Sequence, residues 1–320
     1  MTEPAVLYSR DGHVGVLTLN RPDQRNAMTP ELLGDFAVAV ERAKADRGAR
    51  AVVLVGTGSC FSAGADLHSS LKTGDPNGLP HERSFAMYAP FLELRNVGVP
   101  VIAALQGHAV GGGFGLSLMA DIRIANERDK YGANFARLGL HSGMAISFML
   151  PRLVGVSRAS ELLYTGRLVI GAEAERIGLV SEALPGEQVF PRAMELAGEI
   201  ALSSPRAVRQ MKQTMKTLLG WDVEGAARLE ALLQSESLTT ADAAEGLAAM
   251  REKRAPSSRT TDPGALPGSV AVVRPEGARA LDVWYTRGPC PSPPHSRCPS
   301  RSCPSRCTAS QTPRPPAPRA

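Results

Sequence analysis

The pattern of hydrophobic residues predicts short strands that alternate with helices in the first half of the chain. Ala51–Val55 and Val101–Leu105 are unbroken apolar runs, typical of strands that are buried on both faces. Val6–Ser9 and His13–Leu19 flank the turn sequence Arg10–Gly12, which predicts a hairpin. Two further short strands are predicted at Ile122–Ala125 and Leu179–Ser181.

Polar capping residues mark where several predicted helices begin. Thr29 before Pro30 starts a helix that extends to about Ala45, and Ser204 before Pro205 starts another. From Pro191 to residue 254 only helices are predicted. The expected helices are at about 30–45, 81–94, 114–120, 143–150, 158–163, 172–177, 191–201, 205–217, 222–236 and 240–250. Strands and helices followed by helices alone indicate an α/β core over 1–200 with an α-helical part of the same domain over 201–254.

The last 66 residues, 255–320, have a different composition from the rest of the chain. Nine arginines and three acidic residues give this tail a net charge of +6, so the +5 of the whole chain leaves −1 for residues 1–254. The tail holds 14 prolines, many serines and almost no periodic apolar pattern, which predicts disorder. GC-rich coding sequence translated in the wrong frame gives a similar arginine- and proline-rich composition, which is an alternative origin.

Charge and cysteine content narrow the class of protein. The net charge of residues 1–254 is close to zero, so it does not favour binding to nucleic acid or to an anionic membrane. No apolar run is long enough to span a bilayer. Cys60 is alone in the first 254 residues, which indicates a reducing, cytoplasmic setting. Cys298, Cys303 and Cys307 in the tail lack zinc-ribbon spacing, so no metal site is expected.

A glycine-rich turn follows the buried strand at Val101–Leu105. Three consecutive glycines, Gly111–Gly113, allow the backbone to approach a ligand with no Cβ in the way. The helix expected after them would turn its free N–H groups and positive dipole end toward that ligand. This favours a site for an oxygen that carries or gains negative charge, with a tight strand-to-helix turn as the alternative. The small-residue loop Gly56–Leu67 follows the same logic.

Groups of residues recur here in an order and at separations typical of one known family. They are Leu19–Pro22 with Asn26–Ala27, Phe61–Leu67, Pro100–Ala104 with Gly107–Gly113, Ala120–Ala125, Leu138–Gly139, and Leu163–Gly166 with Ala172–Val180. Over about residues 5–254 the chain therefore resembles the crotonase superfamily, also called the enoyl-CoA hydratase/isomerase family. The resemblance implies an α/β fold, a spiral of ββα turns with a helical C-terminal part, assembled as a homotrimer or a dimer of trimers.

The resemblance also implies an acyl-CoA or enoyl-CoA substrate. Family members polarise the thioester carbonyl with two backbone N–H groups, which map to Ala65 and Gly112 and would stabilise an enolate. Coenzyme A would be part of the substrate, so no separate cofactor is implied. The residues that the resemblance places around coenzyme A are Arg25, Ala27, Ala63, Ala65, Asp66, Leu67, His68 and Gly112.

The sequence departs from the family at the catalytic carboxylates. Hydratases of this family use two glutamates to handle water, and the matching positions here are Gly115 and Phe135. No Asp or Glu occurs between Asp129 and Glu161. Ordinary hydration of an enoyl-CoA should then be slow, because each general acid–base group contributes roughly 10²–10⁴-fold.

Few side chains could replace the glutamates. His141 lies in the segment that borders the acyl pocket in relatives and can titrate near neutral pH, with a packing role as the alternative. His81 and Glu82 begin a helix from a region where some relatives recruit catalytic groups, although a capping role suits them as well. His108 is expected to be structural, and Ser142 has no well-placed base.

Three functions remain compatible with these residues. The first is an enzyme that stabilises a thioester enolate during isomerisation, hydration of an unusual substrate, or C–C or thioester cleavage. The second is a catalytically silent acyl-CoA binding protein with the same fold. The third is an assembly partner within a trimer of active relatives.

Overall fold

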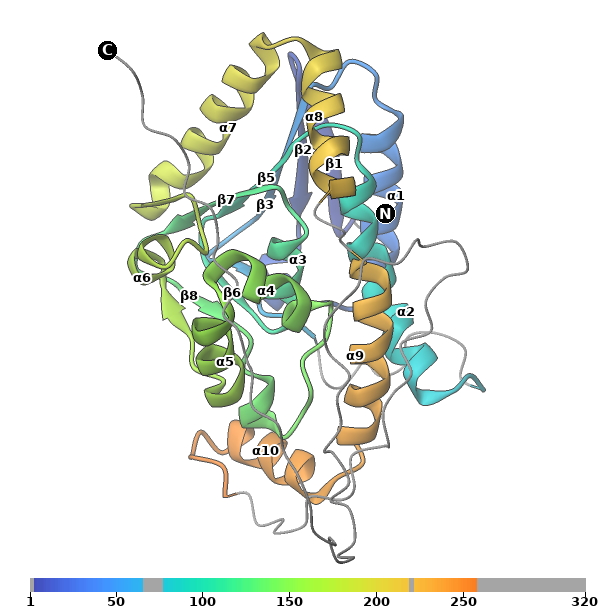
Figure 1. Ribbon diagram of the computed structural model, residues 1–320, viewed down its shortest axis with the longest axis vertical. Coiled ribbons are helices and arrows are strands. Elements are labelled where there is room, and N and C mark those ends of the chain that lie inside the picture. Colours follow the sequence, from blue (N-terminus) through green and yellow to red (C-terminus); the bar gives the residue numbers. More distant parts are fainter. Residues whose placement is uncertain (1–2, 66–76, 219–221, 258–320) are drawn as a thin grey trace, which may run out of the picture. The chain divides into compact units, whose positions relative to one another are not determined.

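The computed structural model describes residues 3–65, 77–218 and 222–257 (Figure 1). All of them belong to one compact unit, Met1–Pro263. Most of the predicted disordered tail, from residue 258 onward, lies outside the described residues. No helix in the described part of the chain is both long enough and apolar enough to span a bilayer.

The larger of two sheets is parallel except at one edge, where the first two strands form the predicted hairpin. The central strands are apolar throughout because the sheet is covered on both faces. Val52 and Leu54 face one hydrophobic cluster, whereas Val53 and Val55 face a second cluster with Val189, Ala193 and Ala197. In spatial order its strands are β1 (Val6–Asp11), β2 (Val14–Leu19), β3 (Ala51–Gly56), β5 (Val101–Leu105), β7 (Ile122–Asn126) and β10 (Glu182–Leu184).

A second, smaller sheet consists of very short strands that sequence analysis missed. Its order among the described residues is β4 (Cys60–Ser62), β6 (His108–Val110), β8 (Lys130–Gly132) and β9 (Val169–Ile170). The expectation of a plain loop over Gly56–Leu67 was therefore wrong at β4, because three residues are too few to show a periodicity.

The order of the two sheets along the chain produces a spiral. Along the chain, each of three strands of the larger sheet is followed by one strand of the smaller sheet: β3 by β4, β5 by β6, and β7 by β8. A helix follows β4 and β6 before the chain returns to the larger sheet. The α/β spiral of ββα turns expected from the resemblance is thus confirmed.

The helices agree with the predicted ones to within a few residues. Thr29 caps α1, where its hydroxyl accepts a hydrogen bond from the Leu32 N–H at 3.2 Å and Pro30 is the first helical residue. The helices are α1 (Pro30–Ala45), α2 (Pro80–Leu92), α3 (Gly112–Leu118), α4 (Ile146–Val154), α5 (Val156–Thr165), α6 (Gly171–Arg176), α7 (Gly186–Leu202), α8 (Pro205–Leu218), α9 (Val223–Ser237) and α10 (Ala241–Arg251).

Three elements differ from expectation. Helix α7 begins at Gly186, five residues before the predicted start at about residue 191, so Pro191 lies inside it. The last strand is β10 at Glu182–Leu184, three residues beyond the predicted Leu179–Ser181, because Leu179 and Val180 pack in the core after α6 instead. The segment Tyr131–Leu140, for which no helix or strand is predicted above, includes the end of β8 and a 3₁₀ helix, Phe135–Leu138.

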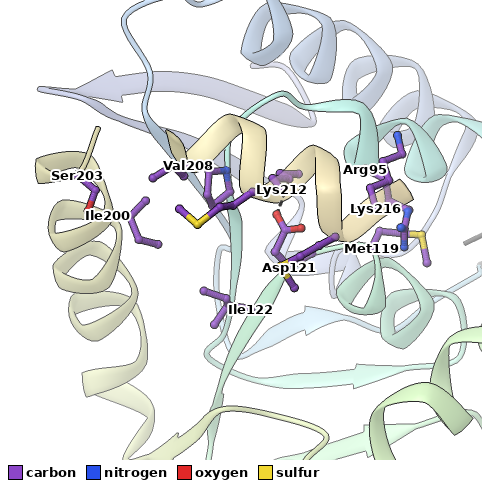
Figure 2. Close-up of a pocket in the computed structure, with 13 residues that line it drawn as sticks. Arg95, Met119, Asp121, Ile122, Ile200, Ser203, Val208, Lys212 and Lys216 are labelled. Atoms are coloured by element: carbon purple, nitrogen blue, oxygen red, sulfur yellow. Dashed lines mark hydrogen bonds and ion pairs between the residues drawn. The ribbon is translucent and has the colours of Figure 1, made fainter. Parts of the chain in front are cut away.

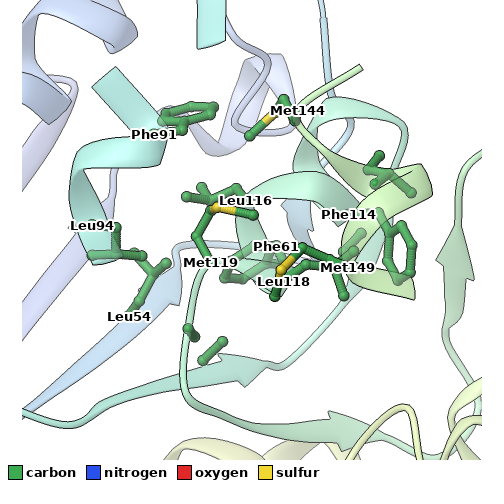
Figure 3. Close-up of a cluster of buried hydrophobic side chains, with 14 of the residues drawn as sticks. Leu54, Phe61, Phe91, Leu94, Phe114, Leu116, Leu118, Met119, Met144 and Met149 are labelled. Atoms are coloured by element: carbon green, nitrogen blue, oxygen red, sulfur yellow. The ribbon is translucent and has the colours of Figure 1, made fainter. Parts of the chain in front are cut away.

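The short helix α3 lies at the centre of the core. Every one of its residues is buried. Figure 3 shows Phe114, Leu116 and Leu118 of α3 among side chains from β3, β4, α2 and α4. Because close packing surrounds this helix, the glycine turn at its N-terminus is held in one position.

The C-terminal helices pack back onto the spiral. Helix α9 lies along α2 and also contacts α4 (Figure 1). Helix α9 therefore borders the chain segment 141–147, which leads into the first turn of α4. That position allows residues from the C-terminal part to act on the region around the glycine turn.

Candidate functional site

Two loops distant in sequence are joined by backbone hydrogen bonds. The Ala63 N–H donates to the Arg25 carbonyl at 3.0 Å, and the Met28 N–H donates to the Gly64 carbonyl at 2.9 Å. These bonds place Arg25, Ala27, Ala63 and Ala65, four of the predicted binding residues, in one small region. Asp66, Leu67 and His68, the remainder of that stretch, lie outside the described residues.

Asn26 holds this pair of loops together from inside. Its side chain is fully buried, accepts a hydrogen bond from the Arg21 N–H at 2.8 Å and donates to the Cys60 carbonyl at 2.9 Å. The Ser62 hydroxyl donates to the Asn26 carbonyl at 2.8 Å. Arg25 and Asn26 have φ values of 52° and 50°, a conformation that Asn tolerates better than most residues. The loop is thus rigid where it meets the glycine turn.

The glycine turn approaches this loop backbone to backbone. A methyl group on Gly64 would lie 2.5 Å from the Val110 carbonyl oxygen and 2.9 Å from the Gly112 nitrogen, and Gly64 has a φ of +83°. A methyl group on Gly112 would collide with the Met28 sulfur and would lie 3.7 Å from the Ala65 nitrogen. Gly64 therefore has to be glycine, because it meets backbone atoms at a positive φ, whereas at Gly112 the flexible Met28 side chain can move aside. This approach brings the peptide groups of Ala65 and Gly112 next to each other.

Both of these N–H groups are available as donors. Gly112 is the first residue of α3, so its N–H has no acceptor within the helix. The bridge between Ala65 and Met28 uses the Gly64 carbonyl and leaves the Ala65 N–H unused. Within the described residues, neither N–H donates to a protein acceptor. Two neighbouring donors at a helix N-terminus can bind an oxygen that gains negative charge.

Apolar atoms lie beside the glycine turn at Gly115 and at Phe135, the two positions where the resemblance described above implies glutamates in hydratases. A methyl group on Gly115 would lie 2.8 Å from the Met144 Cβ and 3.3 Å from the Ile146 Cδ1. The Phe135 Cζ lies 3.8 Å from where a methyl group on Gly111 would be. The turn is therefore bordered by carbon and sulfur atoms at Gly115, and at Gly111 by the Phe135 ring and by the Asn134 Oδ1, which would lie 3.5 Å from the same methyl group.

His141 is half-buried and lies between the spiral and α9. Its Nδ1 is 2.8 Å from the Ser142 carbonyl oxygen, which can only accept, so Nδ1 carries the proton and Nε2 is unprotonated in the neutral ring. Its backbone N–H donates to the Ser237 hydroxyl at 3.0 Å, and its carbonyl accepts from the Gln234 amide at 2.9 Å. Among the residues that the structure describes, no group hydrogen-bonds to Nε2, so this nitrogen can accept a proton.

Sequence analysis missed Glu230, a carboxylate buried in α9. It accepts hydrogen bonds from the Ile146 N–H at 3.2 Å, the Ser147 N–H at 2.8 Å and the Ser147 hydroxyl. Burial raises the pKa of Glu230, and the hydrogen bonds from Ser147 oppose that shift. Glu230, although distant in sequence, therefore caps the N-terminus of α4. This helix begins directly after Met144 and Ala145, whose φ values of 61° and 56° are unfavourable for residues other than glycine.

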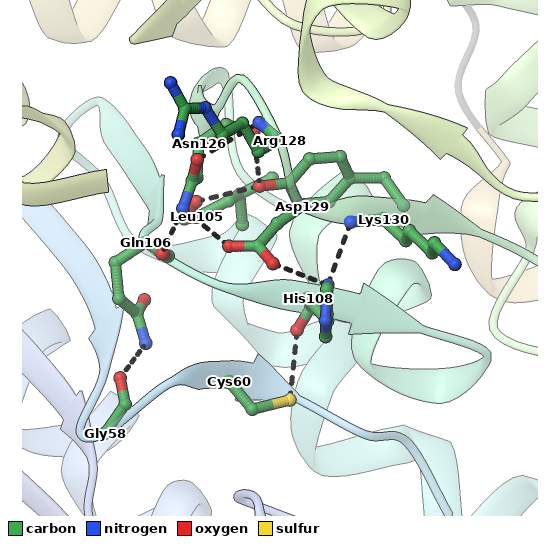
Figure 4. A network of polar contacts seen from close by, with 10 residues as sticks. Gly58, Cys60, Leu105, Gln106, His108, Asn126, Arg128, Asp129 and Lys130 are labelled. Atoms are coloured by element: carbon green, nitrogen blue, oxygen red, sulfur yellow. Dashed lines mark hydrogen bonds and ion pairs between the residues drawn. The ribbon is translucent and has the colours of Figure 1, made fainter. Parts of the chain in front are cut away.

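The other predicted side chains have structural surroundings. Glu82 accepts a hydrogen bond from the Leu79 N–H at 3.0 Å at the start of α2, which fits the capping role, and His81 is half-buried beside it. His108 begins β6, at the opposite end of that strand from Gly111, with its Nδ1 2.8 Å from Asp129 (Figure 4). Burial raises the pKa of Cys60 to about 11, and its thiol donates to the His108 carbonyl.

A cavity of about 320 Å³ lies elsewhere, between α7, α8 and the edge of β7 (Figure 2). Lys212 donates to Asp121 at 2.7 Å and to the Val99 carbonyl at 2.7 Å, so this ion pair fastens α8 to the core. Burial lowers the pKa of Lys212. Neither glycine loop contributes to the lining of this cavity.

Comparisons with known proteins agree on one family. A family model described as enoyl-CoA hydratase/isomerase matches residues 9–260. The probable enoyl-CoA hydratase echA8 of Mycobacterium tuberculosis is 33% identical over 256 residues, which are 80% of this chain and 98% of that protein.

Solved structures give the same result. An enoyl-CoA hydratase/isomerase from Pseudoalteromonas atlantica has a TM-score of 0.71 at 29% identity, over 80% of this chain and all of that one. A carnitinyl-CoA hydratase from Mycobacterium avium has a TM-score of 0.70 at 32% identity, over 81% of this chain and 99% of that one.

The approach of the two loops predicts that Gly64→Ala destabilises the protein by about 3 kcal/mol, through the strained φ and the collision with the Val110 carbonyl. The control is Gly34→Ala, in an exposed part of α1 with open space around it, which should stabilise by about 1 kcal/mol. Urea unfolding of both variants measures this. Equal effects of the two substitutions would contradict the interpretation.

The capping of α4 predicts that Glu230→Ala lowers the free energy of unfolding by about 3 kcal/mol, because two buried N–H groups and the Ser147 hydroxyl lose their acceptor. Glu236→Ala, on the exposed side of the same helix, should change it by no more than about 0.5 kcal/mol. Chemical denaturation compares the two variants. A small effect for Glu230→Ala would show that its hydrogen bonds contribute little.

Proposed function

Because the chain belongs to the enoyl-CoA hydratase/isomerase family, we propose that it binds an acyl-CoA thioester and stabilises its enolate at the Ala65 and Gly112 N–H groups. The observation that carries this proposal is the pair of adjacent donors without protein acceptors in the described part of the chain. Negative charge develops on the thioester oxygen when a proton leaves the neighbouring carbon. Fixed N–H dipoles stabilise that charge without reorganising.

Coenzyme A would bind along the paired loops. Arg25 is exposed next to Ala63, and its guanidinium suits the phosphates at the nucleotide end. Ala27, Ala63 and Ala65 offer small side chains and backbone groups to the pantetheine arm. Asp66, Leu67 and His68 complete the binding set in this proposal.

Proton transfer is assigned to His141 in this proposal. Its free Nε2 can accept a proton, and it lies three residues before Met144, which contacts Gly115. The apolar surroundings of Gly115 and Phe135 favour movement of a proton between substrate carbons over addition of water. Isomerisation therefore fits the site better than hydration.

A catalytically silent acyl-CoA binding protein is the second candidate function. It is favoured by Met144 and Phe135, which border the turn where the hydratases have carboxylates. The decisive experiment follows a panel of enoyl-CoAs by loss of the conjugated thioester absorbance, with acyl-CoA binding measured by calorimetry. Turnover supports the enzyme, binding without turnover supports the silent binder, and absence of binding refutes both.

The same family membership leads us to propose a homotrimer or a dimer of trimers. Analytical ultracentrifugation of the full chain tests this. A monomer at micromolar concentration would refute it.

The role of the Gly112 N–H predicts that Gly112→Pro reduces turnover by about 100-fold, equivalent to about 3 kcal/mol, because proline has no N–H to donate. Proline is otherwise compatible with the first residue of a helix. The matched control, Gly112→Ala, adds similar bulk near the Met28 sulfur but keeps the N–H, so it should retain more activity. Equal turnover of the two variants would exclude the N–H from the reaction.

Assignment of proton transfer to His141 predicts that His141→Ala lowers turnover by about 100-fold. The backbone hydrogen bonds to Ser237 and Gln234 remain, so the fold around residue 141 should persist. Steady-state kinetics and thermal unfolding of the same preparation separate the two effects. Full turnover in the variant would remove His141 from the mechanism.

A further inference from the structure

Tyr88 on α2 carries a hydroxyl group that the fold leaves unpaired. Its side chain is 1% exposed, and within the described residues the hydroxyl oxygen has no hydrogen-bond partner. Tyr131 is buried to the same degree, yet its hydroxyl lies 3.0 Å from the Leu105 carbonyl oxygen and 3.1 Å from the Asn126 carbonyl oxygen. A buried hydroxyl without a partner destabilises a protein, so an unpaired one calls for a ligand or another role.

A line of contacts leads from the paired N–H donors to this hydroxyl. Gly115 lies three residues after Gly112 in α3, and a methyl group on it would lie 2.8 Å from the Met144 Cβ. The residue before Met144 is Gly143, where a methyl group would collide with the Tyr88 hydroxyl. The hydroxyl therefore lies against the backbone of Gly143, the residue that precedes Met144.

The Met144 side chain, which follows Gly143 and lies beside Gly115, can change its conformation. Met144 is unbranched, with three rotatable bonds, and packs in the same hydrophobic cluster as Tyr88 and Phe91 (Figure 3). An acyl chain that displaces it would extend among apolar side chains toward the Tyr88 hydroxyl. The thioester end would then lie at Gly112 and the distal end of the acyl group at Tyr88.

The charge nearby narrows the chemistry of the group that Tyr88 could bind. Glu230 accepts hydrogen bonds from Ile146 and Ser147, in the same short segment whose Gly143 meets the Tyr88 hydroxyl. Burial raises the pKa of Tyr88, and the charge of Glu230 adds to that shift. Among the described residues, the Glu230 Oε2 accepts one hydrogen bond, from the Ile146 N–H, and keeps lone-pair capacity. A ligand hydroxyl could accept from Tyr88 and donate toward the carboxylate. A ligand carbonyl can only accept, so the carboxylate would repel it.

We propose that Tyr88 recognises a hydroxyl group at the distal end of the acyl chain, an inference that rests on the proposed function. The preferred ligands are then acyl-CoAs that carry a hydroxyl group far from the thioester. An alkyl chain would leave the tyrosine hydroxyl unpaired in the complex. An ammonium group would have to lose its hydration among Met144, Phe91 and other apolar side chains. A neutral hydroxyl avoids both costs.

The test measures binding of saturated thioesters, which lack the double bond needed for enoyl chemistry. Hexanoyl-CoA, 6-hydroxyhexanoyl-CoA and 6-aminohexanoyl-CoA are titrated into the full-length protein by calorimetry, with the four- and eight-carbon analogues alongside. We expect a hydroxylated ligand to bind about tenfold more tightly than its alkyl counterpart at one of these lengths. Tighter binding of the alkyl or amino ligand at every length would overturn the inference.

Tyr88→Phe removes the hydroxyl alone. In this variant the ratio of the two Kd values should fall to about one, and the midpoint of urea unfolding should stay the same or rise. The control Tyr131→Phe loses a paired hydroxyl, so its midpoint should fall while the Kd ratio persists. A preference that survives in Tyr88→Phe, or a clear loss of stability in it, would overturn the assignment.

The outcomes separate this inference from the proposed function. Equal binding of alkyl and hydroxylated ligands by the unmodified protein refutes the role of Tyr88 and leaves acyl-CoA binding intact. Absence of binding by all of these thioesters refutes the proposed function and the inference together.

Discussion

The close approach of Gly64 to Gly112 is the constraint on which the candidate site depends. Three segments of the backbone meet there: the Arg25–Met28 loop, the end of β4 and the start of α3. No side chain larger than hydrogen fits at Gly64, so the peptide planes themselves form the contact surface. Because backbone groups rather than side chains supply the donors, their direction is set by the fold, and the surrounding core fixes it.

Hydrophobic packing and buried hydrogen bonds hold Gly64 and Gly112 in this close contact. The fully buried α3 positions the glycine turn, and the buried Asn26 side chain positions the opposing loop. Asn26 is held in a left-handed conformation by bonds to three separate backbone groups. A site built in this way has little freedom to adapt its donors, which suits stabilisation of a charge that develops at one defined atom.

Much of this arrangement could be predicted from sequence, and the failures have a common cause. Long apolar runs such as Val101–Leu105 and capped helices such as the one after Thr29 carry local signals, and they were placed well. The strands of the smaller sheet are two or three residues long, so no periodicity can mark them. The convergence of the two loops was expected from resemblance to a family, since spacing alone left a plain turn as an equal alternative.

Glu230 and Tyr88 could not be anticipated, because their surroundings arise from contacts across long sequence separations. Glu230, Gln234 and Ser237 recur at helical spacing on one face of α9, and each of their side chains hydrogen-bonds to the segment from His141 to Ser147. The C-terminal helical part therefore holds the segment that contacts Gly115. In the proposed function, the spiral core would supply the donors for the thioester, while α9, through its bonds to the segment from His141 to Ser147, would shape the distal end of the acyl site. Such a division would allow the acyl preference to change through the C-terminal helices without altering the donors, which are backbone groups of the core.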